Sequence, residues 1–406
     1  MARTAIFLSI VAATSLAAAP IAGQSPAPVT MDSAVAIALR ANFDVLAARL
    51  RVDSAHAERR IAGAFTNPTA AVVPAVPYQY SLAAPVDVWP QRAYRVQAGS
   101  LGASAAVLDR RDTERLVRFE VRVRFANLLL AHQFQTIADE SRDIMVQLLA
   151  ADSVRLRAGD IPERDVAQTE LELVRAEAAR AAAAAVLRGA RLDLQAAMGV
   201  AEPDPAFAIA GSLDYRPIGV PLDSLMLGGV SSRPDLAAAQ TRVEQSSALH
   251  ALAGAQVVPV PTVGVVWQPT GPFPNGEHVA LSLGLAVPVF NWFGGERERA
   301  AAGEASARVA AARAGAQARS EILAAEEQFR AARELAERYE RGLLAKTQAA
   351  LENARYAYGA GAISLLELLN SVRTFGAVRA DYYTALHDYW VSVYALCRAA
   401  GREVAP

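Results

Sequence analysis

The residue types that most often catalyse reactions or bind metals are scarce in this sequence. It has five histidines and a single cysteine, Cys397. The histidines are far apart and none belongs to an HExxH motif, so the sequence predicts no zinc site. One cysteine also excludes a disulfide framework within the chain. No GxSxG nucleophile motif is present. We therefore expect no catalytic residue, no metal site, no cofactor and no enzymatic activity.

The overall charge is nearly balanced, with 40 Lys and Arg residues against 41 Asp and Glu residues, a net charge of -1. Proteins dedicated to nucleic acid need a basic surplus, so we expect no nucleic-acid partner. Hydrophobic residues make up 53% of the chain, which is too many for extended disorder. The mean hydropathy of +0.18 raises the question of a membrane.

The start of the chain has the pattern of a secretory signal peptide. Arg3 precedes an apolar run from Ala5 to Ala19, and small residues follow. We assign residues 1–23 to this signal, because the apolar run is too short to span a bilayer comfortably. The later apolar stretch at 257–267 is also short and contains two prolines. Entry into a membrane would therefore require a closed β-barrel.

The chain contains an internal repeat. Residues 44–64 align with residues 235–255, and both segments share an Asp, an Arg-Val pair and an Ala-Gly-Ala ending at equivalent positions. Further matches follow in the same order: Ser81-Leu82 with Ser282-Leu283, Gly159-x-Ile161 with Gly361-x-Ile363, and Gly199 with Gly401. The sequence thus predicts two repeats, residues 24–199 and 222–406, joined by a Pro-rich linker at 200–221.

Each repeat shows the same order of predicted elements. A helix (residues 31–65 and 222–257) precedes two short β segments, then a proline-free helical stretch at about 92–157 and 295–358. A glycine turn and a returning helix complete the repeat, with Asp160 and Ser364 as the expected N-caps. Such long helices suggest coiled-coil-like packing.

The segment 279–289 alternates large apolar residues with small ones. The large residues are Leu281, Leu283, Leu285, Val287 and Val289. A strand of a soluble sandwich would alternate similarly, but its other face would carry charged residues. We therefore predict a membrane-facing strand. Aromatic residues at the predicted strand ends fit the membrane interface, among them Trp89, Trp267 and Trp292. Pro74, Pro77 and Pro85 predict short or irregular pairing in the first half.

The duplicated order of helix, strand pair, long helix, glycine turn and return helix resembles the TolC-like outer-membrane efflux proteins. The segments MDSAVAIALRANFDVLAARLRVDSA, RLRAGDIPERDVAQTELELVRAEAA and YAYGAGAISLLELLNSVRTFGAVRADYYTAL resemble the opening helix and the two hairpin tips of that family. The resemblance covers essentially the whole chain after the signal. The length and compact loops are similar to the heavy-metal or cation efflux branch.

This resemblance implies a mainly α fold with a small β part and a homotrimer in the cell outer membrane. Each chain would supply four strands to a twelve-stranded transmembrane β-barrel surrounded by outer-membrane lipid, and duplicated long helical hairpins to a periplasmic tube. The protein would be the passive duct of a tripartite efflux system. A periplasmic adaptor would dock on it, and an inner-membrane pump, of the RND type, would supply the energy.

The resemblance also implies roles for the hairpin tips. The pore constriction would involve Glu367 and Asn370 in the second half, and Asp165 and Gln168 in the first. Asn370 stands where the family prototype has a second acidic residue. The adaptor contacts would be Gly159, Asp160, Ile161, Gly361, Ala362, Ile363 and Ser364. Three alternatives remain open: a solvated helix residue for Glu367, the exit duct of a type I protein-secretion system, and a periplasmic coiled-coil adaptor or structural protein. The exported substrate is not predicted.

Overall fold

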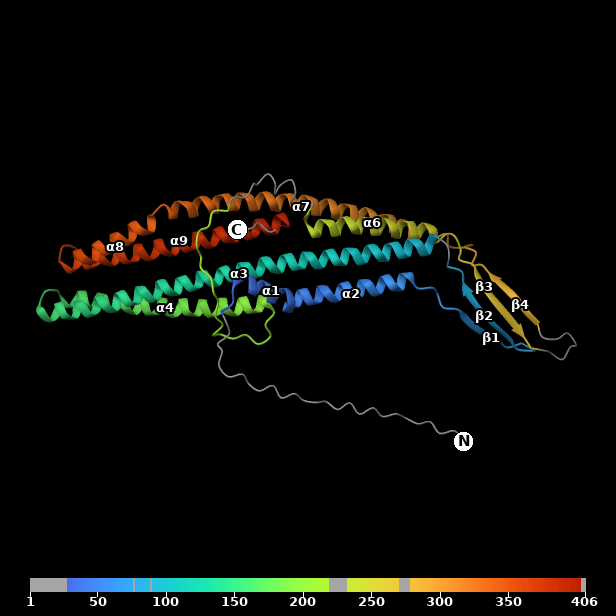
Figure 1. Ribbon diagram of the computed structural model, residues 1–406, viewed down its shortest axis with the longest axis horizontal. Helices are drawn as coiled ribbons and strands as arrows, with labels where there is room; N and C mark the ends of the chain where they lie inside the picture. Colours follow the sequence, from blue (N-terminus) through green and yellow to red (C-terminus); the bar gives the residue numbers. More distant parts are fainter. Residues whose placement is uncertain (1–27, 76, 88–89, 219–231, 270–277, 403–406) are drawn as a thin grey trace, which may run out of the picture.

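The computed structural model describes residues 28–75, 77–87, 90–218, 232–269 and 278–402. These residues form a long helical rod with a small β-sheet at one end and two hairpin tips at the other (Figure 1). The predicted signal peptide, Trp89 and the predicted helix start near residue 222 lie outside the described residues. No helix in the described ranges is both long enough and apolar enough to cross a membrane.

Both halves have helix, strand pair, long helical segment and return helix in the same order, but the breaks between helices fall at different places. The first half contains α1 (Met31–Ala41), α2 (Phe43–Gly63), β1 (Thr69–Val73), β2 (Gln79–Pro85), α3 (Pro90–Ala158) and α4 (Glu163–Met198). The second half contains α6 (Pro234–Ala255), β3 (Thr262–Gln268), β4 (His278–Gly284), α7 (Gly294–Glu340), α8 (Leu343–Gly359) and α9 (Leu365–Ala400). The predicted long helix of the first half is confirmed as α3, whose 69 residues span about 100 Å.

Two predicted helices are interrupted in the structure. The prediction of one helix over residues 31–65 was wrong, because the backbone leaves the helix at Asn42. The Oδ1 atom of Asn42 then accepts hydrogen bonds from the amides of Asp44 and Val45 and caps α2. The prediction of one continuous helix over 295–358 was also wrong. Gly342 adopts a left-handed conformation (φ 95°) that ends α7 and starts α8.

The four strands form one antiparallel sheet in the order β1-β2-β3-β4. Strands β2 and β3 pair across the two halves, with Tyr80 opposite Trp267. The predicted strand 279–289 was too long: β4 ends at Gly284, opposite Thr262, because its partner β3 begins only after Pro261. Leu285, Val287 and Val289 therefore follow the strand. The expected short pairing in the first half is confirmed for β1, which has five residues. It is not confirmed for β2, which ends at Pro85 but has seven residues, as many as β3 and β4.

The apolar core lies along the middle of the rod. Phe125 and Leu128 of α3 are buried in the same cluster as Phe329 of α7 and Leu386 and Tyr389 of α9. A second cluster lies nearer the tips and includes Leu148 of α3, Leu351 of α8 and Leu368 of α9. These shared clusters join the two helical hairpins, so burial of apolar surface holds them side by side.

Equivalent contacts close each half of the chain. The Asn42 side chain donates a hydrogen bond to the carbonyl of Ala197 near the end of α4 (2.9 Å). In the second half, Arg233 precedes α6 and donates to the carbonyl of Ala399 near the end of α9 (3.2 Å). Arg233 is only 3% exposed and also forms ion pairs with Asp235 (2.6 Å) and Glu321 (2.7 Å). The start of each half is thereby fixed to its own last helix.

Candidate functional site

The two hairpin tips have the same backbone geometry. At the first tip, Gly159 is left-handed (φ 81°), and the amide of Asp160 donates to the carbonyl of Arg155 (2.9 Å). At the second tip, Gly361 is left-handed (φ 72°), and the amide of Ala362 donates to the carbonyl of Ala357 (2.8 Å). Both are Schellman motifs, which need glycine at the left-handed position. The tips lie at the end of the rod opposite the sheet (Figure 1).

The return helices begin differently at the two tips. Ser364 is the N-cap of α9, as predicted, and forms a capping box with Glu367. The amide of Glu367 donates to the Ser364 hydroxyl (3.3 Å), and the amide of Ser364 donates to the Glu367 carboxylate (3.1 Å). The predicted cap at Asp160 was wrong. The N-cap of α4 is instead Pro162, whose side chain cannot accept a hydrogen bond. Asp160 belongs to the Schellman turn and lies two residues before the N-cap position.

The capping box can be removed without changing any charge. We expect Ser364→Ala to destabilise the first turn of α9 by about 1 kcal/mol, because the amide of Glu367 loses its acceptor. Hydrogen exchange of the amides that follow Ser364 measures this loss. Ser364→Asp is the control, since aspartate also accepts at this position and should preserve protection. Equal protection in wild type and Ser364→Ala would show that the cap contributes nothing.

The predicted constriction residues lie near the tips but on separate helices. Glu367 and Asn370 are exposed on one side of α9, one turn apart. On α4, Asp165 lies 3.4 Å from Arg164, and Gln168 donates to Glu172 (3.3 Å). Among the described residues, no hydrogen bond or ion pair joins the α9 pair to the α4 pair. Their role at a constriction thus stays a prediction.

A buried polar junction that the sequence analysis missed joins the two hairpins near the tips. Asp152 of α3 has no exposed surface. Its carboxylate accepts hydrogen bonds from the Thr169 hydroxyl of α4 (2.8 Å) and the Tyr358 hydroxyl of α8 (2.7 Å). Burial raises the pKa of Tyr358, and its hydrogen bond to Asp152 raises it further, so the phenol remains a donor. The junction links three helices from both halves through one carboxylate.

An ion-pair cluster makes a second link between the hairpins. Glu172 of α4 is buried and lies 2.8 Å from Arg373 of α9 and 2.7 Å from Arg175. Burial alone would raise the pKa of Glu172, but the hydrogen bond and positive charge of Arg373, with the charge of Arg175, lower it overall. The contact therefore favours the ionised form of Glu172 and holds α4 against α9.

The lowered pKa of Glu172 predicts a pH-dependent link. A group whose pKa is lower in the folded protein stabilises the fold above its ordinary pKa, which is 4.5 here. This stabilisation is lost as the pH falls through the lowered value. We expect acidification to weaken the α4–α9 contact, seen as reduced hydrogen-exchange protection around Glu172. Glu172→Gln should lack this pH dependence, whereas Glu170→Gln, an exposed neighbour on α4, should retain it. Identical pH profiles for all three proteins would contradict the prediction.

The sheet exposes apolar side chains on one side. Leu281 is 83% exposed and Leu283 is 79% exposed, and the intervening Ser282 is less exposed. All five residues of β1, at the opposite edge, are exposed. Each of these edge strands has a hydrogen-bonded neighbour on one side only. The Tyr80 and Trp267 rings lie 5.2 Å apart at one end of the sheet. The unpaired backbone groups of the two edges and the exposed apolar side chains indicate that this sheet has further binding partners.

The described residues contain no group of three or more His, Cys, Asp or Glu residues that could hold a metal ion. The candidate site therefore consists of the hairpin tips, the two polar links between the hairpins and the apolar sheet. The glycines of the tips could be predicted from the internal repeat. The buried Asp152 and Glu172 carried a weaker signal: each is an acidic residue within a helical stretch that packs on both sides.

Comparison with known proteins finds one sequence relative and several solved structures that match nearly the whole chain. No protein-family model matches the sequence. The cobalt-zinc-cadmium resistance protein CzcC of Cupriavidus metallidurans is 24% identical over 394 residues, covering 93% of this chain and 91% of CzcC. Among solved structures, CusC has a TM-score of 0.75 with 20% identity, covering 92% of both chains.

The CmeC outer membrane channel of Campylobacter jejuni also has a TM-score of 0.75, with 16% identity, and the match covers 93% of this chain and 87% of CmeC. The sequence relative spans nearly the whole chain, and the solved channels share its fold over more than 90% of its length. The two solved structures are described as a transmembrane channel and an outer membrane channel. The resemblance seen in the sequence is thus confirmed: the chain is similar to CzcC over nearly its whole length and has the fold of solved outer-membrane channels.

Proposed function

We propose that this chain is one third of a trimeric outer-membrane duct, which exports its cargo passively and is gated at its periplasmic tips. The single observation that carries the proposal is the four-stranded sheet with an exposed apolar side and two open edges, attached to a rod of long helices. Pairing of β4 in one chain with β1 in the next would satisfy both edges. Three chains would close a twelve-stranded barrel.

The test is the location and assembly of the full chain expressed in a Gram-negative host. We expect it in the outer-membrane fraction, where gentle detergent extraction yields a trimer by native mass spectrometry. A monomer in the soluble periplasmic fraction would overturn the barrel and favour the alternative of a periplasmic adaptor. The relatives are outer-membrane channels, which supports the duct over that alternative.

Gating is proposed at the end of the rod where the hairpins are linked. The Asp152 junction and the Glu172 ion pairs both join helices of the first hairpin to helices of the second. Separation of the hairpins would have to break these links, so they favour a closed state of the tips. The exposed tips themselves, around Gly159 and Gly361, would contact the adaptor, and an inner-membrane pump of the RND type would supply the energy.

The proposed carboxylate ring at Glu367 can be tested separately from its capping role. Glutamine also serves as the partner in a capping box, so Glu367→Gln removes the charge and keeps the cap. In planar bilayers we expect the cation-to-anion permeability ratio to fall several-fold, because three carboxylates near the pore axis attract cations. Ser364→Ala is the matched control, since it removes the cap and keeps the charge. Unchanged selectivity in Glu367→Gln would place Glu367 outside the constriction.

The proposed cargo is a metal cation, which rests on the relative named for cobalt, zinc and cadmium resistance. The same relative favours efflux over the exit duct of a type I protein-secretion system. A host that lacks its own cation efflux duct should gain tolerance to these metals when it expresses this chain with a matching adaptor and pump. Tolerance that does not depend on the chain would contradict this cargo.

A further inference from the structure

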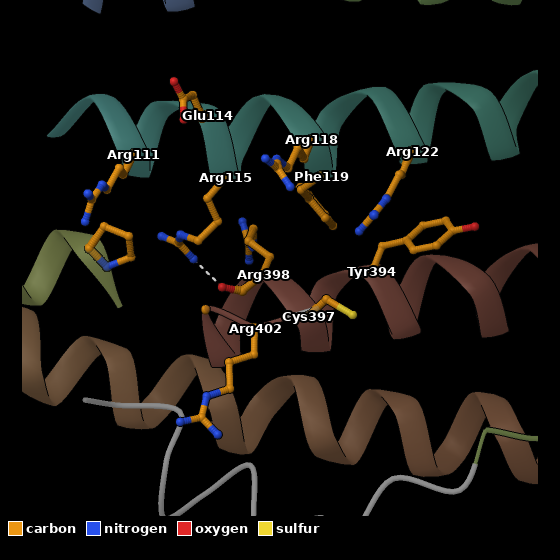
Figure 2. Close-up of a pocket in the computed structure, with 12 residues that line it drawn as sticks. Arg111, Glu114, Arg115, Arg118, Phe119, Arg122, Tyr394, Cys397, Arg398 and Arg402 are labelled. Atoms are coloured by element: carbon orange, nitrogen blue, oxygen red, sulfur yellow. Dashed lines mark hydrogen bonds between the residues drawn. The ribbon is translucent and has the colours of Figure 1, made fainter. Parts of the chain in front are cut away.

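A cluster of arginines lies in the middle of the rod, away from the hairpin tips and the sheet. The α3 members are spaced by four, three and four residues, which places them on one face of the helix. Figure 2 shows Arg111, Arg115 and Arg122 extending from α3 toward α9, and Arg398 of α9 between the two helices. The arginines that line this cavity of about 250 Å³ are Arg111, Arg115, Arg118, Arg122, Arg398 and Arg402.

The positive charge of this cavity exceeds the negative charge around it. Glu114 is the one acidic residue among its described lining residues, and it lies 3.6 Å from Arg110. The α9 C-terminus adds only about half a negative charge. Arg115 lies 2.6 Å from Asp112 and 3.8 Å from Asp235, and it also donates to the carbonyl of Arg398. Arg118 and Arg122 also make interactions of their own. Arg111 and Arg398 alone still outnumber Glu114.

Arg398 lines the cavity, and one of its donors has no acceptor. Its guanidinium is stacked on the Phe119 ring, 4.6 Å from the centroid, which fixes its position. Its Nε atom is buried and has no hydrogen-bond partner within the described part of the chain. A buried donor without an acceptor is costly, and such groups usually have a protein, water or ion partner. Arg398 therefore lines the cavity and carries a donor without an acceptor, and the excess of positive charge at the same place favours an anion.

We propose that this cavity binds a soluble tetrahedral oxyanion of the phosphate type. A guanidinium pairs with two oxygens at a time. A carboxylate offers only two oxygens, whereas a phosphate group offers at least three and can engage several arginines together. The bound anion would connect α3 with the C-terminal end of α9, where the second half of the chain closes on Arg233. It would thereby stabilise this junction.

The position of the cavity favours a soluble anion over the phosphate of a lipid headgroup. Helix α3 begins at Pro90 next to the sheet, and Arg111 lies about 30 Å further along it. The headgroup layer extends only about 5–8 Å beyond the hydrocarbon core on each side. If the sheet crosses the outer membrane, lipid headgroups end well before the cavity. This step alone rests on the proposed function, and the choice of a phosphate-type ligand does not.

The experiment is isothermal titration calorimetry of the full-length protein in detergent, with inorganic phosphate against chloride at equal ionic strength. We expect saturable binding at one site per chain. The double variant Arg111→Gln/Arg398→Gln should bind at least ten-fold more weakly. The matched control is Arg188→Gln/Arg313→Gln, which removes two exposed arginines from α4 and α7 outside the cavity and should bind like wild type. If the double variant does not fold, the exposed Arg111→Gln alone should still weaken binding.

Several outcomes would overturn the proposal. Phosphate binding that does not saturate, or that weakens equally in the control, would show that the cavity is not a site. Binding of hexaglutamate but not phosphate, lost in the double variant, would instead assign the cavity to an acidic polypeptide. Arginine-dependent retention of phosphatidylglycerol in nanodiscs, without phosphate binding, would assign it to lipid. These measurements need no transport and no barrel, so their failure is distinct from failure of the fractionation test.

Discussion

Replacing Gly199 with alanine is expected to destabilise the protein by about 2–5 kcal/mol. Gly199 ends α4 in a left-handed conformation (φ 78°), which costs a residue with a Cβ atom about 1–2 kcal/mol. An added Cβ would also lie 2.4 Å from the carbonyl oxygen of Ala41 and 2.7 Å from the Cα atom of Asn42. Both neighbours are backbone atoms at the junction of α1 and α2, so relief requires a shift of that junction.

Two control glycines separate the two contributions to the Gly199→Ala effect, which are the left-handed backbone and the close approach of the added Cβ atom. Gly361 is also left-handed (φ 72°), but an added Cβ would meet nothing within 4 Å, so Gly361→Ala should cost only about 1–2 kcal/mol. Gly189 lies inside α4 with open space around it, and Gly189→Ala should not destabilise the helix. Thermal unfolding in detergent gives the ranking, and hydrogen exchange at the Asn42 amide reports the junction. Equal losses for Gly199→Ala and Gly361→Ala would show that the close approach is unimportant.

Much of the fold could be predicted because the sequence contains an internal repeat. The glycines at 159 and 361 recur at equivalent positions, and a tight turn between two long helices needs a left-handed residue there. The breaks at Asn42 and Gly342 were missed, since each occurs once and both residue types are tolerated within a helix. The early end of β4 depends on where β3 begins, and that is a property of the partner strand.

The candidate site was predictable only where local sequence determines it. The Ser364 capping box follows from residue types three positions apart. Asp152 is different, because its partners Thr169 and Tyr358 come from two other helices and meet only in the folded chain. The arginine stripe on α3 looks like a solvated helix face in the sequence. It becomes a cavity wall only when α9 ends opposite it.

Replacing Tyr358 with phenylalanine is expected to weaken the contact between the hairpins by about 3 kcal/mol and to open the tips. The Asp152 carboxylate is fully buried and would keep a single side-chain donor, the Thr169 hydroxyl. Removing one partner of a buried acidic group costs more than a neutral hydrogen bond contributes, because the group cannot recover water. Reduced hydrogen-exchange protection in α8 and higher single-channel conductance would report the change.

The chain offers a matched control and a decisive second variant. Tyr356 lies on the same helix and is 83% exposed, so Tyr356→Phe removes a hydroxyl without touching Asp152 and should behave like wild type. Adding Asp152→Ala to Tyr358→Phe removes the stranded carboxylate and should recover part of the lost stability. Conductance should stay high in this double variant, because the link between α3 and α8 is still absent. Recovery of both stability and low conductance would show that Asp152 affects folding but does not hold the tips closed.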